Sequence, residues 1–230
     1  MSSVYSQPRV DGRQPSHLRP VSLSFGEFSR ADGSCSFGFG DSSASCSVTG
    51  PVEAKQLYSS FQGLAFDVSV RPVSGVPTSI ERLLESQVAA LLRSVVETEK
   101  YPYMQLNVSI EVKSSDGSLA AVVLNAAVLA VLHTSAVSMR TVPLSVSLAH
   151  THKGLLIDPD AAEELNAGCE TLSICMHSGR VLQSGGSNLD IVTVFDAISL
   201  AQAAVAAIAP SVRKALGDHL APLLNRVIID

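Results

Sequence analysis

Acidic side chains gather in the last third of the chain, where their types and spacing could do chemistry. They are Asp158, Asp160, Glu163, Glu164 and Glu170. A carboxylate cluster of this kind can hold a divalent metal ion or transfer a proton. The same residues also suit a solvated acidic loop that caps the elements following it, and we favour this second interpretation.

Two histidines form a second possible ligand set. His150 and His152 are two residues apart at a predicted strand end, so both imidazoles point to one side. No third ligand follows at a spacing usual for zinc, and we therefore predict no metal and no other cofactor. A hydrolase triad is not expected either, because the hydroxyl-rich stretch 41–45 lacks a Gly-x-Ser-x-Gly elbow.

The charge balance limits which partners the chain can attract on its own. The net charge is −5, so electrostatics alone does not favour nucleic-acid binding. Arg71, Arg82 and Arg93 are the candidates for RNA contact, although surface solvation or pairing with another subunit suits each of them better. The apolar stretch 119–132 is too short to span a bilayer, so no membrane association is expected.

Hydrophobic periodicity predicts the elements that must position these residues. Alternation of apolar and polar residues predicts strands at 21–25, 35–39, 44–48, 64–70, 105–113, 144–148, 155–157 and 171–176. Cys35 and Cys46 are expected to face each other across a hairpin as small buried thiols. The pair Gly50-Pro51 is expected to end the second arm of that hairpin.

Three regions have helical spacing. Thr78 and Glu81 form a capping-box pattern in front of a helix whose apolar face includes Ile80 and Leu83. The region 119–134 is apolar on nearly all sides and should lie between two layers. The region 188–226 is helical, with a break or kink expected at Pro210. We predict an α/β (α+β) fold with mixed β-sheets packed with helices, in one domain at 18–230 after a flexible lead-in at 1–17.

Short motifs along the chain resemble the signature of RNase PH-type proteins. The N-terminal part contains Asp11-Gly12-Arg13, Leu18-Arg19-Pro20, Ala31-Asp32-Gly33-Ser34, Gly40-Asp41-Ser42-Ser43 and Gly50-Pro51 in the order of that family. The segments 79–84, 115–127 and 156–164 are similar to its first helix, its central helix and its acidic segment. The resemblance covers about residues 9 to 215 and is strongest to ring subunits of the eukaryotic RNA exosome.

The resemblance also shows where this chain departs from active members. Phosphorolytic members carry an arginine at the position of Leu119, after the Gly117-Ser118 pair. A second family arginine falls in the stretch 75–78, which has no cation here. Two family aspartates correspond to Glu164 and Glu170. Because phosphate needs guanidinium groups around it, we expect no catalysis from this degenerate site.

The resemblance implies a structural role in an assembly. The expected partners are other RNase PH-like subunits in a hetero-hexameric ring, cap proteins, and RNA through the assembled complex. The expected function is support of 3′-to-5′ RNA processing and degradation, including rRNA processing, in the nucleus, nucleolus and cytoplasm. Two alternatives stay open: a metal-dependent nuclease using Asp158, Asp160, Glu164 and Glu170, and a phosphorolytic exoribonuclease completed by a neighbouring subunit.

Overall fold

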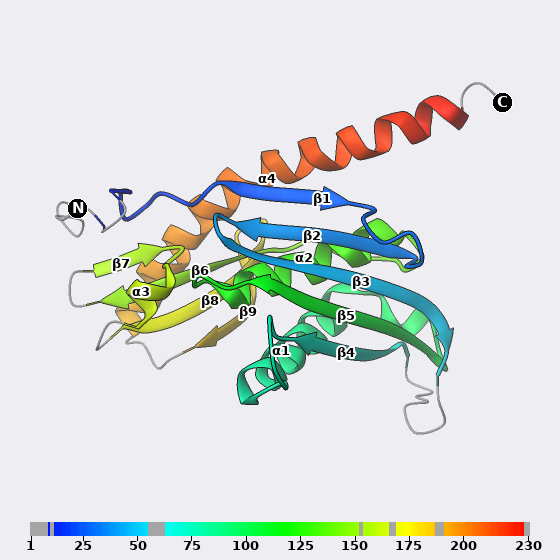
Figure 1. Cartoon of the computed structure of the whole chain (residues 1–230), viewed down its shortest axis with the longest axis horizontal. Coiled ribbons are helices and arrows are strands. Elements are labelled where there is room, and N and C mark those ends of the chain that lie inside the picture. The colour runs from blue at the N-terminus through cyan, green and yellow to red at the C-terminus, as the bar shows by residue number, and fades with distance from the viewer. Residues whose placement is uncertain are drawn as a thin grey trace.

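A five-stranded sheet forms one layer of the computed structural model, which describes residues 9, 12–54, 63–151, 154–165, 169–186 and 191–227. Its strands are β1 (Val21–Phe25), β2 (Gly33–Phe39), β3 (Ser42–Glu53), β4 (Ala65–Arg71) and β5 (Met104–Ser114). They lie in the order β1-β2-β3-β5-β4, antiparallel except for the parallel β4–β5 pair (Figure 1). The predicted mixed sheet is therefore confirmed.

The hairpin of β2 and β3 corrects one predicted boundary. Cys35 and Cys46 are direct partners across it, and both are buried free thiols, as predicted. β3 does not end at Gly50-Pro51, because an irregularity in its register with β5 between Thr49 and Val52 accommodates the proline. The strand continues to Glu53.

A second, antiparallel sheet of four strands faces the first. Its strands are β6 (Leu144–Thr151), β7 (Gly154–Ile157), β8 (Glu170–His177) and β9 (Arg180–Gly186), in the order β7-β6-β8-β9. Two short helical segments lie in connections: the 3-10 turn η1 (Thr98–Lys100) between α1 and β5, and α3 (Ala161–Glu164) between β7 and β8.

Helix α2 (Leu119–Thr134) packs between the two sheets, as its all-round apolar character predicts. Its one strongly polar core residue, Asn125, is fully buried and pairs with the backbone of Ser145 in β6. The side-chain amide donates to the Ser145 carbonyl at 2.9 Å and its oxygen accepts the Ser145 N–H at 2.7 Å. These two hydrogen bonds satisfy the buried side-chain amide of Asn125 and fix the position of α2 along β6 of the second sheet.

Helix α1 (Ser79–Val95) begins at the predicted capping box, in which Thr78 and Glu81 bond each other's backbone. Its buried face is made by Leu84, Val88, Leu91, Leu92 and Val95. The prediction was wrong for Ile80 and Leu83, which are 61% and 59% exposed.

Helix α4 (Ile191–Val227) crosses the second sheet and then runs beside β1, with its C-terminal part projecting from the domain (Figure 1). Of the break or kink predicted at Pro210, the break was wrong, because the helix continues through this proline. A part of α4, Val192–Pro222, is long and apolar enough to span a membrane by composition, and the sequence analysis missed this. Its residues Ala197, Ala201, Ala204, Ile208 and Val212 are buried at helical spacing, so one face packs on the core.

A histidine pair fastens the projecting part of α4 to α2. Nδ1 of His133 accepts the Ser34 N–H at 3.1 Å, so its proton lies on Nε2, which is 3.0 Å from Nε2 of His219. Phe25 stacks on His133 with ring centroids 5.7 Å apart. Burial, and secondly the neighbouring His219, lower the pKa of His133, so the neutral form of the His133 ring is favoured.

Candidate functional site

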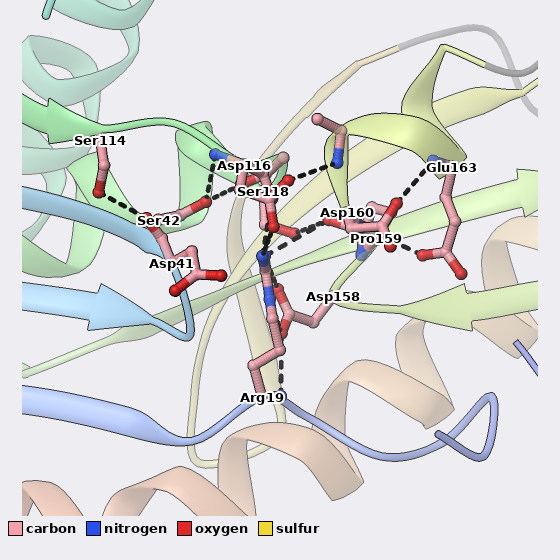
Figure 2. Close-up of polar contacts among 12 residues, drawn as sticks. Arg19, Asp41, Ser42, Ser114, Asp116, Ser118, Asp158, Pro159, Asp160 and Glu163 are labelled. Atoms are coloured by element: carbon pink, nitrogen blue, oxygen red, sulfur yellow. Dashed lines mark hydrogen bonds and ion pairs between the residues drawn. The ribbon is translucent and has the colours of Figure 1, made fainter. Parts of the chain in front are cut away.

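Arg19 joins the segments that contain the motifs described above, because its side chain bonds both Asp116 and Asp158. Figure 2 shows its guanidinium between the ends of β5 and β7, where several turns meet. Its Nε and Nη2 donate to the two carboxylate oxygens of Asp158 at 2.8 and 2.7 Å, and Nη1 donates to the Asp116 carbonyl at 2.7 Å. Burial alone would raise the pKa of Asp158, but the hydrogen bonds and charge of Arg19 outweigh it and lower that pKa.

The turn before α2 is fixed by Ser42 at the start of β3. The Ser42 hydroxyl donates to the Gly117 carbonyl at 2.7 Å and accepts the Asp116 N–H at 2.8 Å. Gly117 has φ +75, and a Cβ there would lie 2.4 Å from the Pro159 carbonyl oxygen. Only glycine fits this position, because it lets the turn lie directly against the β7–α3 connection.

The N-terminus of α2 is where a phosphorolytic relative would hold phosphate according to the family pattern. Ser118 is in the left-handed region with φ +55, and its side chain makes no cap for its own helix. Its hydroxyl donates instead to the Pro159 carbonyl at 2.9 Å, and its backbone N–H donates to Oε1 of Glu164 at 2.8 Å. Leu119 is half-buried and packs against the core.

Glu164 therefore presents a carboxyl group to a helix N-terminus, the kind of position at which free N–H groups bind anions. Burial raises the pKa of Glu164, and Asp158 and Asp160 raise it further, while the Ser118 N–H and Arg19 act in the opposite direction. The net shift is upward, so the ionised form of Glu164 is disfavoured by its surroundings. A phosphate at this terminus would disfavour the ionised form of Glu164 further, because like charges repel.

The other predicted acidic residues have separate partners. Asp160 caps α3 by accepting the Glu163 N–H at 2.7 Å, while Glu163 pairs with Arg9, whose Nε lies 2.7 Å from Oε1. Glu170 begins β8 beside His150, with an oxygen 3.9 Å from Nδ1. Within the described residues, no three His, Cys, Asp or Glu side chains are grouped so that they could hold a metal ion. His152 lies outside the described residues.

The part of the predicted lead-in that the structure describes is attached to this region. Arg9 is 7% exposed and donates from Nη1 to the Ile157 carbonyl at 2.7 Å and from Nη2 to the Asp158 carbonyl at 2.8 Å. The Pro15 carbonyl accepts the Ile157 N–H at 2.9 Å. Through these contacts, Arg9 and Pro15 pack against the end of β7 and the backbone of Asp158.

The three arginines predicted to contact RNA do not gather at this site. Arg71, at the end of β4, is exposed and lies 3.8 Å from Glu111. Arg82 and Arg93 are exposed at opposite ends of α1. The latter two are eleven positions apart in the sequence, a spacing of roughly 16 Å along the helix axis. They could contact an extended ligand together but not a single phosphate.

Sequence reasoning missed the central role of Arg19. It read Arg19 only as part of a Leu-Arg-Pro motif, and it treated Asp158 as a candidate metal ligand. The pairing joins residues 139 positions apart, a separation at which no local pattern connects them. An arginine beside a proline at a strand start, which is unusual for a buried position, was the only available signal.

Comparisons with known proteins agree on one family. Residues 17–136 match the model of the 3′ exoribonuclease family, domain 1 (RNase PH). The exosome complex component rrp46 of Schizosaccharomyces pombe is 30% identical over 65% of this chain and 66% of its own length. The exosome complex component RRP46 of Saccharomyces cerevisiae is 24% identical over 89% of this chain and 98% of its own. The crystal structure of rice Rrp46 superposes with a TM-score of 0.82 at 22% identity, covering 89% of this chain and 98% of that one.

Proposed function

This chain belongs to the RNase PH family of 3′ exoribonucleases, and from that premise we propose that it is a non-catalytic ring subunit of an RNA exosome. The resemblance predicted from the motifs is thereby confirmed at the level of the family. Two relatives named as exosome components, which match along most of their lengths, support the assignment to that complex. Its role would be to support 3′-to-5′ processing and degradation of RNA, including ribosomal RNA.

The observation that carries the non-catalytic part is the contact between Glu164 and the N-terminus of α2. Phosphorolysis requires inorganic phosphate, which binds best to free backbone N–H groups at a helix N-terminus and to guanidinium forks. Here the Ser118 N–H is already bonded to a carboxylate, and Leu119 supplies an apolar side chain where the family pattern has arginine. The place that phosphate would take is therefore occupied by a carboxyl group and an apolar side chain.

The absence of the two family arginines determines how much catalytic rate would be lost. Losing one preorganised contact to the charge that develops in the transition state costs about 2.7–4 kcal/mol, or roughly 10²–10³ in rate. The stretch 75–78 has no cation to replace the second family arginine, and Arg82 is exposed on α1. Arg19 is not available as a substitute, because both arms of its guanidinium are bonded to Asp158 and Asp116.

The surface supports a role inside an assembly. Val73, Val76, Ile80 and Leu83 are all more than half exposed, along the turn after β4 and the first turns of α1. Contiguous exposed apolar residues are typical of surfaces that a partner covers. Other RNase PH-like subunits and cap proteins are the partners that a ring subunit requires, and RNA contact through Arg71, Arg82 or Arg93 would occur in the assembled complex. Such a complex would act in the nucleus, nucleolus and cytoplasm.

Two measurements test this function. Purification of the tagged protein from its own cells should bring further RNase PH-like chains and cap proteins in near-equal amounts, quantified by mass spectrometry. Recovery of the protein alone or as a homodimer would contradict the ring assignment. The purified chain should then release no nucleoside diphosphate from labelled RNA in the presence of phosphate, with an active RNase PH-type enzyme as positive control. Phosphate-dependent release that Glu164→Gln abolishes would overturn the non-catalytic part.

A further inference from the structure

An apolar groove lies beside α4, at the end of α2 opposite to Ser118. It is bounded by the C-terminal end of α2, the facing ends of β6 and β8, and the middle of α4, and its volume is about 580 Å³. Leu132, Leu144, Met176, Val205 and Leu216 supply apolar walls. This volume falls in the range of ligand-binding clefts, which is roughly 300–1,000 Å³.

Few of the described residues that line the groove are polar, and the permanent charge among them is positive. Arg213 lines it, is exposed, and has no ion-pair partner within the described part of the chain. In a chain of net charge −5, this is a local positive site. Gln202 adds an exposed amide that can donate and accept. Nδ1 of His177 donates to the Val142 carbonyl at 3.0 Å, so Nε2 remains an acceptor when the ring is neutral.

We propose that this groove binds a short peptide segment of a partner protein that carries aliphatic side chains and an acidic residue, the latter placed against Arg213. The walls match aliphatic side chains, and the unpaired guanidinium matches a carboxylate in a bidentate pair. The Gln202 side chain can donate and accept hydrogen bonds, and Nε2 of His177 can accept one. A peptide backbone needs such partners, whereas a fatty acyl chain does not. Met176 adds a side chain that adapts to different aliphatic partners.

Two features favour peptide over RNA at this place. Single-stranded RNA is held by aromatic stacking platforms and several cations along its backbone. Among the described residues that line the groove there is no Phe, Tyr or Trp, and Arg213 is the only arginine or lysine. The groove is also open along α4, where Gln202 and Ala206 are exposed, so an extended segment can lie across it. The proposal does not depend on the proposed exosome function.

The test uses the full chain and an array of short synthetic peptides. Each peptide carries two leucines around one glutamate, and each has a matched copy with lysine in place of the glutamate. Wild-type protein should prefer the glutamate copies by about tenfold, which corresponds to roughly 1.4 kcal/mol. Arg213→Glu should reverse this preference, whereas Lys214→Glu, an equal charge change at the adjacent exposed residue outside the groove, should preserve it.

A steric pair of variants checks the location. Ala206→Phe places a ring at the exposed rim of the groove and should abolish binding of both peptide copies, while Ala207→Phe, exposed but outside this groove, should not. Because all four substituted side chains are exposed, unchanged melting curves are expected and confirm folding. Equal binding of glutamate and lysine copies, equal effects of Arg213→Glu and Lys214→Glu, or displacement of the peptides by single-stranded RNA would each overturn the proposal.

Discussion

Replacing Asp158 by asparagine should cost about 3–5 kcal/mol of folding free energy, because it breaks a buried ion pair from one side. Asp158 is 1% exposed and Arg19 8%, and the two share a bidentate contact. The variant leaves the guanidinium without its buried counter-ion. Asparagine is the appropriate substitute because Asp158 has φ +51, a left-handed conformation that asparagine tolerates better than alanine.

The assay is urea and thermal unfolding followed by circular dichroism. For a domain of this size each kcal/mol corresponds to roughly 2–4 °C, so the midpoint should fall by roughly 6–20 °C. Arg19→Met and the double variant complete a cycle, in which the pair should show a coupling energy of about 2 kcal/mol. Arg71→Met removes an exposed ion pair with Glu111 and, as the matched control, should change stability by less than about 1 kcal/mol.

The pH dependence of the same variant gives a second check. Since the pKa of Asp158 is lowered in the folded state, its contribution is complete above the pKa of the unfolded state, about 3.9, and is lost as the pH falls through the folded-state value. The difference between wild type and Asp158→Asn should therefore narrow at acid pH. A loss below about 1 kcal/mol, or losses that simply add in the cycle, would refute the assignment of Arg19 and Asp158 as the centre of this region.

Three further results are expected. Glu164→Gln should raise the melting temperature near neutral pH, because burial raises the pKa of this carboxyl and its ionised form costs free energy. Thermal melts should show that the gain disappears below about pH 4, where the carboxyl is protonated in both the folded and the unfolded state. Gly117→Ala should destabilise more in urea than Gly75→Ala, since both have positive φ but only Gly117 would place a Cβ against backbone; the control should cost roughly 1–2 kcal/mol. Acidification below about pH 6.5 should increase hydrogen exchange in the C-terminal part of α4, because the lowered pKa of His133 means that its neutral form stabilises the folded state. His219→Gln keeps a hydrogen-bond acceptor for His133 and should weaken the pH dependence of this exchange.

The sequence predicted elements well wherever local chemistry decides the structure. The capping box at Thr78 and the bounds of α2 at Leu119 and Thr134 agree with the structure, because each depends on neighbours in the chain or on a complete apolar surface. Ile80 and Leu83 were assigned to the buried apolar face of α1, but both are exposed. Helical periodicity shows which side of a helix is apolar, but not how far along its length another layer covers it.

The contacts of the candidate site could not be predicted in the same way. Ser118 and Glu164 are 46 residues apart, and their contact depends on how α3 follows β7. The family resemblance placed both residues at the degenerate site, but it did not indicate that the carboxylate bonds the helix N-terminus. Likewise, the five acidic residues form a compact group in sequence, yet each finds a different partner once the strands are placed.

The substitution at Leu119 and the raised pKa of Glu164 have one physical explanation. A carboxylate at the start of a buried helix is stabilised when a guanidinium stands beside it, and the family pattern would put one at position 119. Leucine packs against the core instead, so Glu164 keeps only the Ser118 N–H and the more distant charge of Arg19 to offset its burial. Meanwhile Arg19, Asp158, Ser42 and Gly117 hold the surrounding turns through contacts that involve no phosphate. Under the proposed non-catalytic function, these contacts would keep the framework of the site intact without its chemistry, as a structural subunit of a ring requires.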